Sequence, residues 1–270
     1  MTLYIPKGRR TRRGFAPTSI ARNARESEAP WAWRGATSVF PVFTGGLQDQ
    51  AHPRTVALQP GASDALPKRI VTGAGPAYRC NSSKGRTGSG NDDVESFDYE
   101  SNTVQIESGS DFTFWFAGYI NALNGSNAGF FRTGDSAEGD TFCIFNGSDP
   151  IPWIRWAGTD ILKIANGADF TLGEFVTLVF VVRSAQDAEF WVNGELKRAA
   201  THITATPSRI VRYVGFQFGE QDWIEGDYLA WGFADRAWGR SDSEALHNFD
   251  MFRRRPLLVP VSSGGGTGVS

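Results

Sequence analysis

The sequence predicts an all-β sandwich that ends in a short helix and a tail, and three observations predict it. Residues 179–182 (VFVV) form a β-branched run typical of a strand, and residues 188–192 (AEFWV) lead into Asn193-Gly194. An Asn-Gly pair between strands favours a hairpin, because both central residues of the preferred turn need positive φ. Residues 227–233 alternate large apolar residues with small or polar ones, as a strand with one buried face does. Residues 241–244 (SDSE) have the spacing of a capping box, which indicates the start of a helix.

Other strands are expected from local patterns. Residues 112–115 (FTFW) resemble an early core strand, residues 141–145 (TFCIF) a middle strand, and residues 172–178 the strand that precedes the hairpin. Residues 195–197 return from the hairpin turn. The order is therefore strand, hairpin, strand and helix.

The helix is expected to begin with Ser241, whose hydroxyl and the carboxylate of Glu244 would satisfy backbone donors of the first turn. Pro256 lies beyond its end. One face of this helix is apolar and should pack on the sandwich; it carries Ala245, Leu246, Phe249 and Phe252.

We expect three segments. Residues 1–67 contain many prolines and glycines and little periodic apolar pattern, which predicts an extended arm rather than a separate core. Residues 68–252 carry the strands and the helix, and they are numerous enough for one β-sandwich domain. Residues 253–270 form a tail that is first Arg-rich and then rich in glycine and serine.

Charge is segregated along the chain. The first 25 residues contain seven basic residues and no acidic one, and three consecutive arginines at 253–255 are followed by no acid. The other 17 basic residues face all 29 acidic residues, so the body carries about −12 and the two ends together +10. This asymmetry predicts that the ends contact acidic neighbouring subunits, through Lys7, Arg9, Arg10, Arg12, Arg13, Arg253, Arg254 and Arg255. Nucleic acid is the less favoured partner, because no aromatic residues interleave the arginines of residues 7–13.

Aromatic residues of the arm suggest how it is held. Trp31 and Trp33, with Phe40 and Phe43, are bulky apolar groups on an extended segment. They either anchor the arm on a neighbouring subunit or close over the sandwich's own core, and the sequence leaves both interpretations open.

Four of these patterns, taken in order, resemble a laminin-G type, concanavalin A-like jelly roll over about residues 69–252. They are residues 112–115, 172–178, 191–194 (WVNG), and 234–238 (ADRAW) before the SDSE box. The tail, residues 251–256 (MFRRRP) and 259–266, is similar to the tail of such domains in virion proteins of tailed bacteriophages.

This resemblance implies a non-enzymatic structural protein of a virion, assembled in the host cytoplasm. We expect a head decoration or accessory protein that contacts the major capsid protein, and it would form a homo-oligomer. A tail-fibre, neck or adaptor protein with a glycan-binding jelly roll is the first alternative.

The chain has no recognisable catalytic motif. His52, His202 and His247 lack the spacing of zinc ligands, and no GxSxG elbow is present. Residues 220–225 (EQDWIE) resemble the bulged Glu-x-Asp-x-Glu motif of some concanavalin A-like glycoside hydrolases, so a hydrolase using Glu220 and Glu225 is the second alternative. Flanking glycines indicate a solvated acidic loop instead, and we expect no enzyme activity.

Binding of a cofactor is not expected. Acidic residues of the loop 134–140, namely Asp135, Glu138 and Asp140, could hold calcium as in some laminin-G domains, but their spacing matches no specific calcium loop. Trp153, Trp156 and Trp223 lie in or beside expected loops, where an indole could stack on a sugar ring; burial in the core or an interface is the alternative that we favour.

The two cysteines, Cys80 and Cys143, are expected to be free thiols. No apolar run approaches about 18 residues, so no membrane span is expected. No apolar segment follows the basic N-terminus, so we expect no secretory signal.

Overall fold

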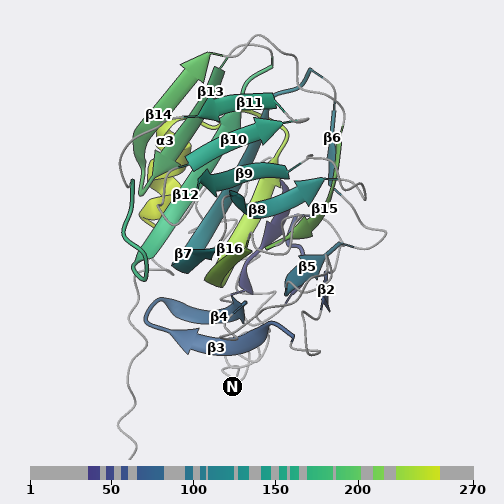
Figure 1. Cartoon of the computed structure of the whole chain (residues 1–270), viewed down its shortest axis with the longest axis vertical. Helices are drawn as coiled ribbons and strands as arrows, with labels where there is room; N and C mark the ends of the chain where they lie inside the picture. Colours follow the sequence, from purple (N-terminus) through teal and green to yellow (C-terminus); the bar gives the residue numbers. More distant parts are fainter. Residues whose placement is uncertain are drawn as a thin grey trace, which may run out of the picture.

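The computed structural model describes residues 36–42, 47–51, 56–59, 66–81, 95–99, 104–107, 109–124, 127–133, 141–146, 152–156, 159–163, 169–184, 187–201, 209–215 and 223–249. Across these ranges the chain forms two antiparallel sheets that lie face to face, with one α-helix on the outside of one of them (Figure 1).

The first sheet contains the longest strands. In spatial order it consists of β14 (Glu195–Thr201), β13 (Asp187–Val192), β12 (Phe175–Val182), β7 (Phe112–Asn124), β16 (Trp223–Ala234), β4 (Gly75–Cys80) and β3 (Lys68–Thr72), and β1 (Ala36–Phe40) also pairs with β16. Strands distant in sequence are neighbours here, because β7 lies between β12 and β16.

The second sheet faces the first. Its order is β11 (Thr159–Lys163), β10 (Pro152–Trp156), β9 (Thr141–Asn146), β8 (Asn127–Thr133), β15 (Arg209–Val214), β5 (Ser96–Asp98) and β2 (Ala57–Gln59), and β6 (Val104–Ile106) pairs with β15. The strands β8 to β11 follow one another within the second sheet and β12 to β14 within the first, while the connections from β6 to β7, β7 to β8, β14 to β15 and β15 to β16 cross between the sheets, as in a jelly roll. The predicted all-β sandwich is thereby confirmed.

The main core lies between the sheets and is rich in aromatic rings. Alternate residues of β7 point into it, because side chains of a strand alternate between its two faces. The ring of Phe116 on β7 lies 4.9 Å from that of Phe130 on β8, and Phe97 on β5 lies 4.4 Å from Trp231 on β16, as distances between ring centroids. These contacts join the two sheets, and burying each such side chain stabilises the fold by about 1.5–3 kcal/mol.

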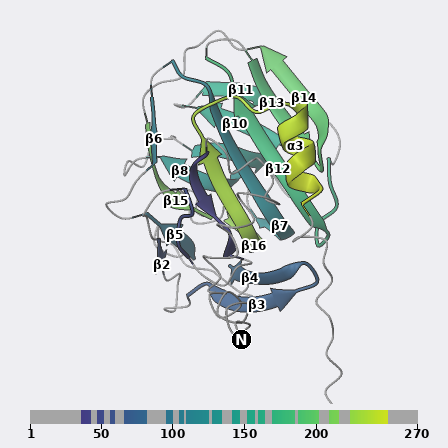
Figure 2. The ribbon, with the colours of Figure 1, turned by 180° about the vertical axis from the view of Figure 1, so that it is seen from behind.

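A smaller core covers the outer face of the first sheet. The helix α3 (Arg240–His247) lies on that face (Figure 2), where Leu246 packs with Val179 and Trp191. The rings of Trp115 and Trp238 stack at 6.0 Å between centroids and are both fully buried. Strands β7 and β12 are therefore buried on both faces, which explains their nearly continuous apolar sequence.

The hairpin prediction is confirmed. Asn193 and Gly194 join β13 and β14 with φ of 52° and 84°, as the favoured turn requires. The strands predicted at residues 112–115, 179–182, 188–192, 195–197 and 227–233 are present. The strand predicted at 172–178 was wrong at its start: Leu172 and Gly173 form a turn, and β12 begins at Phe175.

The start of the helix differs from the prediction. Gly239 is the N-cap and α3 begins at Arg240, so Ser241 is already inside the helix. The backbone N–H of Gly239 donates to Asp242 Oδ2 at 2.9 Å, so Asp242 rather than Glu244 caps the helix. Glu244 pairs instead with Arg240 at 2.7 Å. The pattern SDSE predicted the helix but not its register, because Asp242 also has the geometry of a capping carboxylate.

Part of the segment predicted as an arm belongs to the sandwich. Strand β1 pairs with β16 and β2 pairs with β5, so residues before 68 contribute to both sheets. Phe40 is fully buried and its ring stacks on that of Trp231 at 5.1 Å between centroids. For Phe40, closure over the sandwich's own core is the interpretation that holds. Trp31, Trp33 and Phe43 lie outside the described residues.

Cys80 is buried at the end of β4 and forms no disulfide. Cys143 lies on β9, and its side chain is outside the described part of the structure. Among the described helical residues, none belongs to a helix long and apolar enough to cross a membrane.

Candidate functional site

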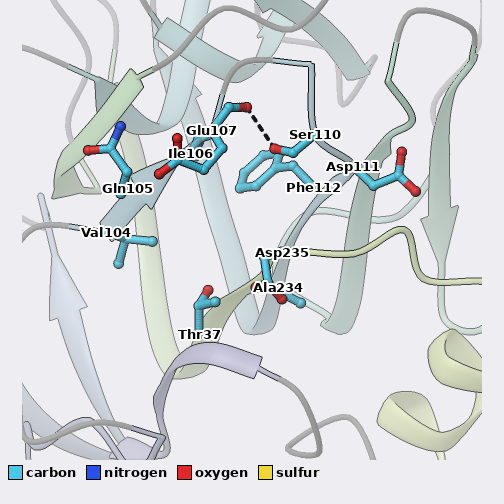
Figure 3. A pocket seen from close by; sticks show the side chains of 10 residues that line it. All are labelled: Thr37, Val104, Gln105, Ile106, Glu107, Ser110, Asp111, Phe112, Ala234 and Asp235. Atoms are coloured by element: carbon cyan, nitrogen blue, oxygen red, sulfur yellow. Dashed lines mark hydrogen bonds between the residues drawn. The ribbon is translucent and has the colours of Figure 1, made fainter.

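A cavity of about 350 Å³ lies at one end of the sandwich, where the two sheets meet (Figure 3). Thr37 of β1 and Ala234 at the end of β16 line it from the first sheet, and residues 104–106 of β6 line it from the second. Phe112, at the start of β7, and the connection between β6 and β7 complete the wall. The cavity is therefore built from segments that the fold gathers from across the chain.

A tight turn shapes the connection between β6 and β7. The backbone N–H and the Oγ of Ser110 both donate to the carbonyl oxygen of Glu107, at 3.3 and 2.7 Å, and Gly109 adopts a φ of 68°. The next residue, Asp111, accepts a hydrogen bond at Oδ1 from the backbone N–H of Ser184 at 2.8 Å. The turn is thus attached to the end of β12, and this holds Glu107 and Ser110 at the cavity.

A buried threonine fixes the opposite wall. Thr113 Oγ1 donates to the carbonyl oxygen of Arg236 at 2.7 Å and accepts from the backbone N–H of Trp238 at 3.0 Å. Both residues follow β16, so the backbone beside Asp235 is held against β7. Asp235 itself is exposed and lines the cavity.

The floor of the cavity is apolar and its rim is polar. Val104, Ile106 and Phe112 are almost fully buried, whereas Glu107 and Asp235 are exposed. Neither of these two carboxylates forms a hydrogen bond or an ion pair with the described residues. An apolar floor with a few polar groups is the usual composition of a small-molecule site. Carboxylates that accept hydrogen bonds suit a ligand rich in hydroxyl groups.

None of the site residues predicted from sequence is among the described residues that line this cavity. Trp153 and Trp156 lie within β10 and Trp223 begins β16, and the side chains of all three lie outside the described part of the chain. The motif ADRAW contained Asp235, but we assigned it no role. No motif marked Glu107 and Ser110, because only the fold brings their turn to the end of β16.

The acidic motif at 220–225 is only partly described. Residues 223–225 open β16, so the expectation of a loop was wrong for Glu225, whereas Glu220 and Asp222 lie outside the described residues.

Arg79, on the neighbouring strand β4, forms a bidentate ion pair with Asp227, with Nε–Oδ1 and Nη2–Oδ2 distances of 2.6 and 2.8 Å. The hydrogen bond to Asp227 raises the pKa of Arg79, and the charges of Asp227 and Glu225 add to the effect. Glu225 therefore lies near enough to Arg79 for its charge to act on that guanidinium, whose ion pair is with Asp227.

A second hollow, of about 580 Å³, lies between α3 and the hairpin of β13 and β14. Its charged groups are paired: Arg240 with Glu244, and Glu195 with the neighbouring Lys197 at 2.6 Å. The side chain of Trp191 donates from Nε1 to Glu189 at 2.9 Å. Its charged groups are already paired, so this hollow offers a ligand fewer unpaired carboxylates than the cavity lined by Glu107 and Asp235.

Other predicted sites lie outside the described residues. These are the basic contact residues Lys7, Arg9, Arg10, Arg12, Arg13, Arg253, Arg254 and Arg255, and the calcium candidates Asp135, Glu138 and Asp140. Within the described ranges, no group of three or more His, Cys, Asp or Glu side chains could hold a metal ion.

Solved structures share this fold at low sequence identity. Domain 4 of AbnA, a GH43 extracellular arabinanase from Geobacillus stearothermophilus solved with arabinotriose, has a TM-score of 0.55 at 13% identity over 78% of this chain and 98% of that domain. The binding domain of Paraclostridial Mosquitocidal Protein 1 has a TM-score of 0.51 at 16% identity, over 80% of this chain and 52% of that chain. Botulinum neurotoxin type C, whose cell entry depends on interaction with two ganglioside molecules, has a TM-score of 0.53 at 11% identity. The match covers 80% of this chain and 51% of the neurotoxin chain.

No protein-family model matches the chain, and no curated protein matches it. The chain spans about half the length of the two toxin chains, but nearly all of the arabinanase domain. At these identities the likeness establishes the fold alone, which is that of a jelly-roll β-sandwich.

Proposed function

We propose that this protein is a non-catalytic binding protein whose sandwich holds a carbohydrate in the cavity between β6 and the end of β16. The observation that carries this proposal is the composition of the cavity. The ring of Phe112 lies in its floor, and the carboxylates of Glu107 and Asp235 at its rim have no partner among the described residues. Such groups accept hydrogen bonds from sugar hydroxyls while an apolar floor contacts the ring carbons.

The structural neighbours support a binding role. The arabinanase domain was solved with a trisaccharide, and the neurotoxin depends on gangliosides, which carry sugars. The arabinanase domain is covered almost completely by this chain, so one sandwich of this size is enough to hold an oligosaccharide. The absence of a catalytic motif in the sequence, and the place of Glu225 beside Arg79, support binding rather than hydrolysis.

The basic ends support a second part of the proposal, namely attachment to a phage particle. They carry +10 against a body of about −12, which suits contacts with other virion subunits. A carbohydrate site favours the tail-fibre, neck or adaptor role over head decoration, because such proteins meet the glycans of a host surface. The protein would then act in the virion after assembly in the host cytoplasm.

A glycan array probed with the full chain tests the carbohydrate proposal. We expect binding to a defined set of glycans and a loss of at least about tenfold in affinity for the double variant Glu107→Ala/Asp235→Ala, equivalent to about 1.4 kcal/mol. Glu174→Ala is the matched control, because Glu174 is an exposed glutamate that does not line the cavity. Equal binding by the double variant, or no glycan bound by the wild type, would contradict the proposal.

A further inference from the structure

The cavity has a strongly one-sided charge. Glu107, Asp111 and Asp235 line it, and among the residues whose side chains the structure describes no lysine, arginine or histidine does. Figure 3 shows the three acidic residues at separate points around the cavity. A ligand in the cavity therefore meets the carboxylates of Glu107 and Asp235, while that of Asp111 accepts a hydrogen bond from the backbone N–H of Ser184.

The cations nearest in sequence to these acids have other partners. Arg183, which precedes Ser184, pairs with Glu189 at 2.6 Å and donates to the carbonyl oxygen of Trp238. The charge of Asp111 also contributes to the raised pKa of Arg183, but as the smallest cause. Arg236, which follows Asp235, pairs with Asp242 at 3.3 Å. The negative charge at Glu107 and Asp235 is thus left without compensation from the described lining residues.

The arrangement does not suit a metal ion. No three acidic side chains of the described residues are close enough to hold one. The space of about 350 Å³ instead admits an organic ligand whose charged group lies among the carboxylates. Its walls shield the interaction from solvent more than a flat surface would, so a charge on the ligand changes affinity more strongly.

We infer that the cavity selects its carbohydrate by charge, and that it binds amino sugars bearing an ammonium group most tightly, neutral sugars less tightly and carboxylated sugars least. This inference rests on the proposed function and specifies its ligand class. Attraction from two uncompensated carboxylates in a partly enclosed site gives about a tenfold preference for each step of this order.

Three β-1,4-linked tetrasaccharides of similar size test the order: those of glucosamine, glucose and glucuronic acid. Isothermal titration calorimetry with the full chain, at low ionic strength and with the amine protonated, should give affinities in that order. Added salt should reduce the differences, because it screens the charges. Equal affinities, or tightest binding of the glucuronic acid tetramer, would overturn the inference.

Isosteric variants locate the effect in the cavity. In Glu107→Gln/Asp235→Asn, affinity for the glucosamine tetramer should fall about tenfold, while that for the glucose tetramer should change by less than about threefold. Glu174→Gln removes an equal charge outside the cavity and should change neither. A preference for glucosamine that survives in the double variant would place the selectivity elsewhere and refute the inference.

The carbohydrate site and its selectivity for charge are contradicted by different results. If the array shows glycan binding that depends on Glu107 and Asp235, but none of the three tetramers binds or their order differs, the charge selectivity is wrong and the carbohydrate site stands. If no glycan binds on the array, both are wrong.

Discussion

The carboxylate of Asp111 accepts a hydrogen bond from the backbone N–H of Ser184 across 73 residues of sequence, with an Oδ1–N distance of 2.8 Å. This bond attaches the connection between β6 and β7 to the end of β12. The same connection carries Glu107 and Ser110, so the rim of the cavity depends on it.

Asp111→Ala should therefore weaken both stability and ligand binding. Loss of one partly buried hydrogen bond to a carboxylate should lower the free energy of unfolding by about 1–2 kcal/mol. Asp111→Asn keeps an acceptor oxygen and should lose less than half of that. Chemical denaturation of the two variants measures the difference, and equal losses would show that the hydrogen bond is not the reason.

Leu246→Ala should destabilise the protein without affecting the cavity. Leu246 is fully buried between α3 and the outer face of the first sheet, so its truncation should cost about 2–5 kcal/mol. The affinity for glycan should stay within about twofold of the wild type, since the cavity is built from other segments. Leu196→Ala is a control on a side chain that is 46% exposed, and it should change stability by less than about 0.5 kcal/mol.

Two glycines separate backbone strain from a steric clash. Gly173 and Gly194 have φ of 81° and 84°, but a Cβ on Gly173 would meet no atom within 4 Å, whereas one on Gly194 would lie 3.2 Å from Glu244 Cα. Alanine at 173 should cost only the strain of a left-handed backbone, about 1–2 kcal/mol. Alanine at 194 should cost more, because α3 must also move. Thermal unfolding followed by circular dichroism compares them, and a smaller loss at 194 would contradict this account.

Truncations should separate the basic arm from the sandwich. Deleting residues 1–25 removes seven basic residues but no described strand, so the protein should fold and lose the attachment to phage particles that we propose. Deleting residues 1–67 also removes β1, β2 and the buried ring of Phe40, whose truncation to alanine alone would cost about 3–5 kcal/mol.

We therefore expect cooperative unfolding only in the shorter deletion. Light scattering and sedimentation with candidate particles test the attachment. Particle binding that persists without residues 1–25 would contradict a role for the basic arm.

Elements with strong local signals could be predicted from the sequence. The hairpin at Asn193-Gly194 was found because positive φ at two successive residues has a specific sequence signature. The start of α3 was displaced, because Asp242 and Glu244 are both suitable capping residues and only tertiary packing selects between them. Strand β1 was assigned to the arm, because its partners on β16 lie 191 to 198 positions further along the chain and leave no local signal.

The cavity could not be predicted for a similar reason. Glu107 and Asp235 are 128 positions apart in sequence, and each lies in a short polar connection without a motif. Their proximity follows from the pairing of β6 with β15 in one sheet and of β16 with β7 in the other. The tryptophans that the sequence suggested, Trp153, Trp156 and Trp223, were chosen by residue type, and their role stays a prediction because the structure does not describe their side chains.

Nuclear magnetic resonance of the isotopically labelled full chain, titrated with the glycan that gives the strongest array signal, tests the central claim most directly. We predict that saturable shifts of backbone amides cluster at Gln105, Glu107, Ser110 and Asp235, which line the cavity. Shifts confined to the hollow between α3 and the β13–β14 hairpin, to other surfaces, or found nowhere would contradict a carbohydrate site in this cavity.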